Sequence, residues 1–228
     1  RAGARGARRA PAGRPGGRGR RPAAAGVAAR APRGLVSLPA HRRHPRAAGR
    51  HILGLSCFYH NSGAALIRDG QIVAAAEEER FSRVKNDRRF PHHAANYCLE
   101  AAGIHQNDLD AVVYYDNAAL TFERIVHTIL AVGDRGEDAW LRVMPSWLRY
   151  KLSIPELIRE YLHYDGRVLQ EVHHRSHAAS AFYPSPFERA AILTIDGVGE
   201  WATASIGVGQ GRDLSLLQEM RFPHSLGL

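Results

Sequence analysis

The chain has 228 residues, of which 45% are hydrophobic and 23% charged, so it can bury a sizeable core and is neither fibrous nor wholly disordered. Its formal charge of +9 is local, because residues 1–50 hold 14 of the 31 basic residues and no acidic one. Residues 51–228 therefore carry 17 basic against 22 acidic side chains, a net charge of −5, so this part of the chain needs no polyanionic partner.

Residues 1–50 are predicted to be a disordered tail, because 43 of them are Arg, Ala, Gly or Pro and have little to bury. Basic tracts without acids also serve as RNA-binding arms or as Arg-rich transit segments. The absence of lysine and the monotony of the tract favour a different interpretation, which is translated GC-rich sequence upstream of the true start.

Order is predicted from His51 onward, beginning with a three-stranded meander whose second turn contains Asp69-Gly70, a strong hairpin signal. An amphipathic helix starts at Pro91 and ends at Gly103. A buried strand over Asp110–Tyr115 and a helix marked by Phe122–Leu130 follow. The three meander strands are Ile52–Cys57, Gly63–Ile67 and Gln71–Ala76.

Residues 134–165 are predicted to be mostly helical, with apolar stripes that are packing surfaces rather than a cofactor site. The last third returns to strands, with one short helix after His177. The alternation of strands and helices predicts an α/β fold. The late strands are Val168–Val172, Ala191–Ile195, Thr203–Val208 and Leu214–Met220.

Cys57 and Cys98 are too few for a disulfide framework and are expected to be buried, reduced side chains. No run of 18 apolar residues occurs, and the N-terminus lacks the apolar segment of a secretory signal. We therefore expect a protein of a reducing compartment, the cytoplasm, without a membrane span.

The strongest chemical signal is His173 and His177, four residues apart where a strand leads into a helix. At helical spacing both imidazoles project from one face and can share a transition metal. Asp196, at the end of an apolar strand and before Gly197-Val-Gly199, is the candidate third ligand. Histidines at this spacing are also commonly solvated or capping residues, which is the alternative.

Two further segments offer weaker signals. His60, in the turn between the first two strands, is a candidate general base, or a turn histidine with no role. The five cations of the charged run from Arg80 to Arg89 could hold a phosphate or carbamoyl phosphate oxyanion, although interleaved acids also fit a solvated loop. Within this run Lys85 is the candidate point charge of a site.

These motifs, in this order from about Ile52 to Leu228, resemble the carbamoyltransferase family that includes nodulation and antibiotic-tailoring O-carbamoyltransferases. The resemblance rests on four segments of the chain. They are Ile52–Ser56 with Tyr59–Ala65, Glu78–Arg83 with Lys85, His173–Ala178, and Asp196–Trp201.

The resemblance implies the first lobe of an actin-like, ribonuclease-H-like ATPase fold, with a mixed sheet and flanking helices. It also implies Fe²⁺ or another divalent transition metal on His173, His177 and Asp196, with His60 as catalytic base and Lys85 as a basic catalytic residue. Gly197 and Gly199 are assigned to the nucleotide or carbamoyl-adenylate. ATP and carbamoyl phosphate would form that adenylate, whose carbamoyl group passes to a small-molecule hydroxyl.

Family members are more than twice as long as residues 51–228, so these residues are expected to be an incomplete N-terminal part of the family's metal-binding domain. A second lobe, a further aspartate ligand and a C-terminal carbamoyl-activating domain would be the missing partners. The acceptor stays open among sugar, aminoglycoside and polyketide hydroxyls.

Two alternatives remain. One is a nucleic-acid-binding protein that acts through the basic arm of residues 1–50, although the acidic body makes nucleic acid a poor partner. The other keeps the superfamily and changes the enzyme to a phosphotransferase or a tRNA-modifying relative.

Overall fold

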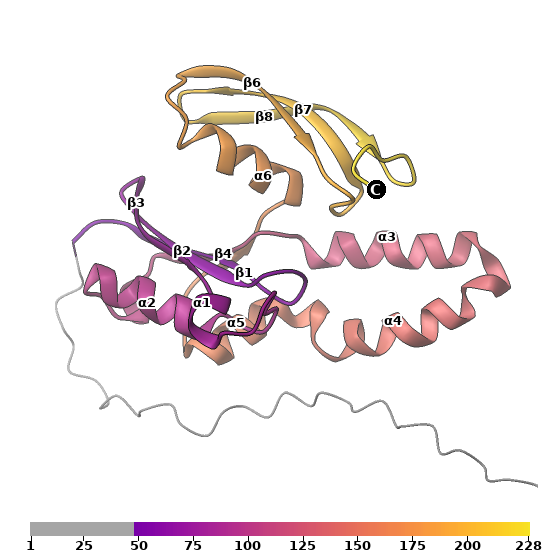
Figure 1. The fold of residues 1–228 in the computed structure, drawn as a ribbon, viewed down its shortest axis with the longest axis horizontal. Helices are drawn as coiled ribbons and strands as arrows, with labels where there is room; N and C mark the ends of the chain where they lie inside the picture. Colours follow the sequence, from indigo (N-terminus) through magenta and orange to yellow (C-terminus); the bar gives the residue numbers. More distant parts are fainter. Residues whose placement is uncertain (1–47) are drawn as a thin grey trace, which may run out of the picture. The chain divides into compact units, whose positions relative to one another are not determined.

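The structure, a computed structural model, describes residues 48–228. The predicted tail of residues 1–50 falls on residues outside this range, except for its last three. Within the described range the chain forms two sheets and six α-helices (Figure 1). No helix in residues 48–228 has the length and apolarity needed to cross a membrane.

The first sheet is mixed and has the strand order β3-β2-β1-β4-β5. β1 pairs antiparallel with β2 and β2 with β3, whereas β4 runs parallel to β1 and β5 parallel to β4. This arrangement confirms the predicted α/β class, with a mixed sheet and flanking helices. Its strands are β1 His51–Ser56, β2 Gly63–Arg68, β3 Gln71–Glu77, β4 Ala111–Tyr114 and β5 Val168–Gln170.

The predicted hairpin between β2 and β3 forms for a local reason. Asp69 and Gly70 both have positive φ, 51° and 84°, which the tight turn requires and which Asp and Gly tolerate. Along β1, buried and half-buried residues alternate strictly, so one face of the sheet is committed to the core.

Helices α1 (Glu79–Ser82), α2 (His92–Ala102) and α5 (Ile154–Leu162) lie beside the first sheet (Figure 1). The main core joins buried residues of α2 and α5 to those of β1, β2 and β4. Cys57 and Cys98 are both buried and both free, as predicted.

Helices α3 (Ala118–Ala131) and α4 (Glu137–Arg149) follow β4. They confirm the helix predicted around Phe122–Leu130 and the helical character of 134–165. The Asn117 side chain caps α3 by accepting the Leu120 N–H at 3.3 Å. Short 3₁₀ turns complete the described chain: η1 Gln106–Asp108, η2 Gly133–Gly136 and η3 Lys151–Ser153.

The second sheet has three antiparallel strands in the order β6-β7-β8. Its bounds are β6 Arg189–Ile195, β7 Ala202–Gln210 and β8 Asp213–Arg221. Helix α6 (His173–Phe182) covers it through Ala178 and Phe182, which contact Ile192 and Leu214. The short helix predicted after His177 begins four residues earlier, at His173, and it therefore carries both histidines, as their spacing predicted.

Candidate metal centre and adjoining cavities

Three predicted ligand side chains converge at the start of α6. His173 and His177 lie one turn apart on that helix, and Asp196 follows the last residue of β6. The imidazole Nε2 of His173 lies 3.0 Å from Asp196 Oδ2 and 3.0 Å from the Nε2 of His177. His177 Nε2 lies 3.9 Å from the same carboxylate oxygen.

The donor set fits a divalent transition metal. The candidate ligand atoms of the three residues all lie within 4.8 Å of one another. Two imidazoles and one carboxylate are the ligands of open three-residue sites, which leave further positions for substrate. The side chains of His173, Asp196 and His177 are 14%, 32% and 48% exposed, so an ion can reach them from solvent.

The electrostatics of the cluster favour the protonation states in which His173 and Asp196 can bind a metal. Burial lowers the pKa of His173, and the neighbouring His177 lowers it further, so the imidazole is held neutral. Burial alone would raise the pKa of Asp196, but the Gly197 N–H and the two imidazoles outweigh it and lower that pKa. A neutral imidazole and an ionised carboxylate are the forms that bind metals.

A buried glutamate that received no role from the sequence supports the cluster. The Oε1 of Glu200 accepts the backbone N–H of His173 and that of Asn117, each at 2.9 Å. Because Val172, the residue before α6, offers no side-chain cap, Glu200 caps this helix from the β6–β7 loop. It therefore ties the first ligand of the cluster to the start of α3.

His174 points away from the cluster, as expected for its place on the helix. Its Nδ1 lies 2.8 Å from Thr194 Oγ1 and 3.0 Å from Ser205 Oγ, in the interface with the second sheet. Gly199 lies against this part of α6, since an added Cβ would meet His173 and His174 at 3.1 Å. A side chain at 199 would therefore displace His173, the first of the predicted ligands.

A cavity of about 570 Å³ contains the cluster. His60 and Gly197 line it together with His173, His177 and Asp196, so the structure brings the predicted base to the predicted ligands. The His60 side chain is exposed, and its ring packs edge-on against Tyr59 at 4.3 Å.

Lys85 is not brought to this cavity. It is exposed in the loop after α1, and neither of the two cavities described here includes it in its lining. Around it, Arg80 approaches Glu77 and Glu79, while Arg89 pairs with Asp87. The catalytic role of Lys85 and the nucleotide roles of Gly197 and Gly199 stay predictions.

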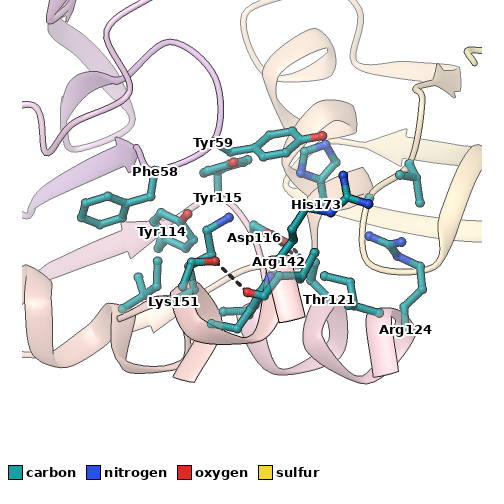
Figure 2. Close-up of a pocket in the computed structure, with 18 residues that line it drawn as sticks. Phe58, Tyr59, Tyr114, Tyr115, Asp116, Thr121, Arg124, Arg142, Lys151 and His173 are labelled. Carbon is teal, nitrogen blue, oxygen red and sulfur yellow. Dashed lines mark hydrogen bonds between the residues drawn. The ribbon is translucent and has the colours of Figure 1, made fainter. Parts of the chain in front are cut away.

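A second cavity, of about 330 Å³, adjoins the first (Figure 2). Tyr59, Tyr115, His173 and Val198 line both. Its polar groups include Asp116, Arg124 and Lys151, which sequence reasoning missed. Asp116 carried the same signal as Asp196, a carboxylate just beyond the carboxyl end of a strand.

Asp116 is a perturbed carboxyl. Burial raises its pKa to about 7, and the nearby carboxylate of Glu200 adds to the rise. The hydroxyl of Thr121 lies 3.2 Å from its Oδ1 and acts in the opposite direction. A carboxyl of this kind can donate or accept a hydrogen bond near neutral pH.

The comparison with known families concerns the same part of the chain. The family model described as the carbamoyltransferase N-terminus matches residues 51–228. The chain therefore belongs to the carbamoyltransferase N-terminus family.

Among proteins, the chain is 48% identical to the uncharacterized protein sll1178 of Synechocystis, over 78% of this chain and 30% of that protein. It is 35% identical to the nodulation protein NolNO of Sinorhizobium fredii, over 75% of this chain and 24% of that protein. The chain thus spans less than a third of the length of either relative. The solved structure of YeaZ from Pseudomonas aeruginosa aligns with a TM-score of 0.40 and 15% identity, covering 75% of this chain and 65% of that chain, which is too weak a likeness to bear on function.

Proposed function

We propose that this chain supplies the metal centre and the general base of an O-carbamoyltransferase that uses ATP and carbamoyl phosphate. The observation that carries the proposal is the convergence of His173, His177 and Asp196 in one cavity with His60. Membership of the carbamoyltransferase N-terminus family supports the reaction type.

His173, His177 and Asp196 would hold a divalent transition metal, with Fe²⁺ the first candidate. Such an ion supplies a positive charge that stabilises the phosphate oxygens of the leaving group. Gly197, in the lining of the same cavity, leaves the backbone accessible to the carbamoyl-adenylate. Activation of carbamoyl phosphate by ATP is assigned to a separate carbamoyl-activating domain.

His60 acts on the acceptor. Its imidazole takes the proton of the acceptor hydroxyl as the hydroxyl oxygen forms its bond to the carbamoyl carbon. The bond between that carbon and the phosphate oxygen breaks, and AMP leaves with the electron pair. His60 is exposed to the cavity and close to Tyr59, so a hydroxyl can reach it from solvent.

The buried free thiols of Cys57 and Cys98 fit a reducing compartment, and we place the activity in the cytoplasm. Lys85 is kept as a candidate for contact with an anionic ligand, in a role that needs a loop movement or a bound partner.

The test is carbamoyl transfer by the purified protein joined to a carbamoyl-activating domain of a family member, and supplied with Fe²⁺, ATP, carbamoyl phosphate and a mixture of hydroxyl acceptors. His60→Ala is expected to keep its bound metal and to lower transfer by about 100-fold or more, the usual contribution of a general base. The matched control is His127→Ala, because His127 is an exposed histidine on α3 that lines neither cavity. Equal transfer by His60→Ala and His127→Ala would refute the assignment of the base.

A further inference from the structure

The cavity of about 330 Å³ beside the metal cluster has the composition of a small-molecule site. Its volume is at the lower end of the range for ligand pockets, and its walls are aromatic with few polar groups. Figure 2 shows aromatic side chains, among them Phe58, Tyr114 and Tyr115, together with polar ones around this cavity. The aromatic lining residues are Phe58, Tyr59, Tyr114, Tyr115 and Trp147.

This aromatic cavity opens toward the metal ligands. Tyr115 and His173, whose ring centroids are 5.4 Å apart, belong to the lining of both cavities. A molecule whose ring occupies the aromatic cavity therefore has one edge beside His173. A hydroxyl on that edge points toward the cavity that contains His60.

The charges of the aromatic cavity are unbalanced. Arg124, Arg142 and Lys151 line it, and within residues 48–228 none of them has a carboxylate oxygen within 4.0 Å. The Nε of Arg124 donates to the carbonyl of Glu200, and that of Arg142 to the carbonyl of Asp138.

Within residues 48–228, Lys151 is the lining cation whose head group makes no hydrogen bond to another residue. It is half-buried, and its Nζ lies 5.1 Å from the centre of the Trp147 ring. The lining carries one carboxyl group, that of Asp116, against three cations. Such a cavity attracts an anion and repels an ammonium group.

We propose that the aromatic cavity binds the hydroxyl acceptor, and that the acceptor is a neutral or acidic sugar ring rather than an amino sugar. The ring stacks between the aromatic walls, Lys151 binds a carboxylate or hydroxyl oxygen, and Asp116 hydrogen-bonds a second hydroxyl. The inference rests on the proposed function in one respect, which is that the bound sugar is the acceptor of the carbamoyl group. Binding of the sugar itself needs neither metal nor ATP.

The test uses three matched probes that differ in charge: methyl glucoside, glucuronate and glucosamine. Their dissociation constants are measured by NMR titration with the full 228-residue chain, without metal or nucleotide. Glucuronate is expected to bind about tenfold more tightly than glucosamine, with methyl glucoside between them, as one charge-assisted hydrogen bond implies. Tightest binding of glucosamine would overturn the proposal.

Lys151→Met should remove the preference for glucuronate and leave the affinity for methyl glucoside within about twofold. The control is Arg149→Met, which should keep the preference, because Arg149 is an exposed cation two residues before Lys151 and lines neither cavity. If Lys151→Met does not fold, the exposed Arg142→Met should reduce the preference instead. An unchanged preference in every folded lining variant would contradict the proposal.

A nucleotide also combines a ring with an anion, so AMP is the competing probe. In the proposed arrangement AMP does not displace glucuronate at equal concentrations. If AMP displaces glucuronate from the wild type but not from Lys151→Met, the cavity is a nucleotide site, and the assignment to the acceptor is overturned. Failure of carbamoyl transfer with intact glucuronate binding would refute the proposed function alone, so the two failures are distinguishable.

Discussion

Two clusters of polar side chains, one around Glu78 and one around Asp196, stand out in the sequence but differ in what surrounds their carboxylates. Glu78 is 3% exposed, and its oxygens accept the N–H groups of His93 and Ala94 at 3.3 and 2.9 Å. The Nδ1 of His93 completes the set at 2.6 Å. Pro91, before α2, has no side-chain cap, so Glu78 takes that place.

In Asp196, only one of the two carboxylate oxygens accepts a hydrogen bond from a backbone N–H group. Its Oδ1 accepts the Gly197 N–H at 2.7 Å, whereas its Oδ2 faces the two imidazoles of His173 and His177. A carboxylate whose donors are all backbone or fixed neighbours stabilises the fold, as Glu78 does. A carboxylate that shares space with other metal-binding groups has coordination left for an ion.

The largest effect should come from breaking the Glu78 cluster. Glu78→Ala leaves two buried or half-buried N–H groups of α2 without an acceptor, and we expect a loss of about 3 kcal/mol in the free energy of unfolding. Urea unfolding measures this loss. Metal uptake by the folded variant should be unchanged.

Glu77→Ala is the matched control one residue away. Glu77 is exposed and only approaches Arg80 at 3.8 Å, so its removal should change the free energy of unfolding by less than about 0.5 kcal/mol. Equal losses in the free energy of unfolding for Glu78→Ala and Glu77→Ala would contradict the structural role of Glu78.

Asp116 offers an intermediate case, a carboxyl that is buried but poorly supplied with donors. Its folded pKa, about 7, is above the ordinary value of 3.8, so the protonated form stabilises the fold. That contribution is present below pH 3.8 and is lost as pH rises through 7. From pH 5 to pH 7 the free energy of unfolding should fall by about 2 kcal/mol more in the wild type than in Asp116→Asn. Urea titrations at both pH values test this, and parallel curves would contradict it.

A smaller effect is expected from Glu200, which positions His173 without binding the metal. Glu200→Ala removes the acceptor of the His173 N–H, and metal affinity should fall about tenfold, as for other residues that orient a ligand. Glu200→Gln keeps an oxygen that can accept this N–H and should restore most of the affinity. If the Gln variant binds metal no better than the Ala variant, the positioning role is wrong. Isothermal titration with Co²⁺ measures all three proteins.

The sequence predicts much of the fold because its signals are local. Asp69-Gly70 fixes the hairpin by its own backbone preferences, and the spacing of His173 and His177 predicts that both lie on one helical face. Asp196 is found because it ends an apolar strand. These three signals needed no knowledge of distant contacts.

The remaining features depend on contacts between distant segments. Glu200 caps α6 from 27 residues away, and the pKa of Asp116 is raised by burial and further by Glu200, which the β6–β7 loop brings beside it. Lys151 lies about 90 residues after Tyr59, with which it shares the aromatic cavity. Glu78, next to the charged run after β3, caps α2, a contact that spacing alone does not reveal.

The most direct measurement of the central claim is a Co²⁺ titration of the purified chain followed by visible absorbance. We predict one equivalent of bound Co²⁺ in the wild type and in the exposed-histidine control His127→Ala. His177→Ala should lose the absorbance band and bind at least about 100-fold more weakly, because it removes one of three ligands. Uptake by His177→Ala that matches the wild type in stoichiometry, affinity and spectrum would contradict the metal centre.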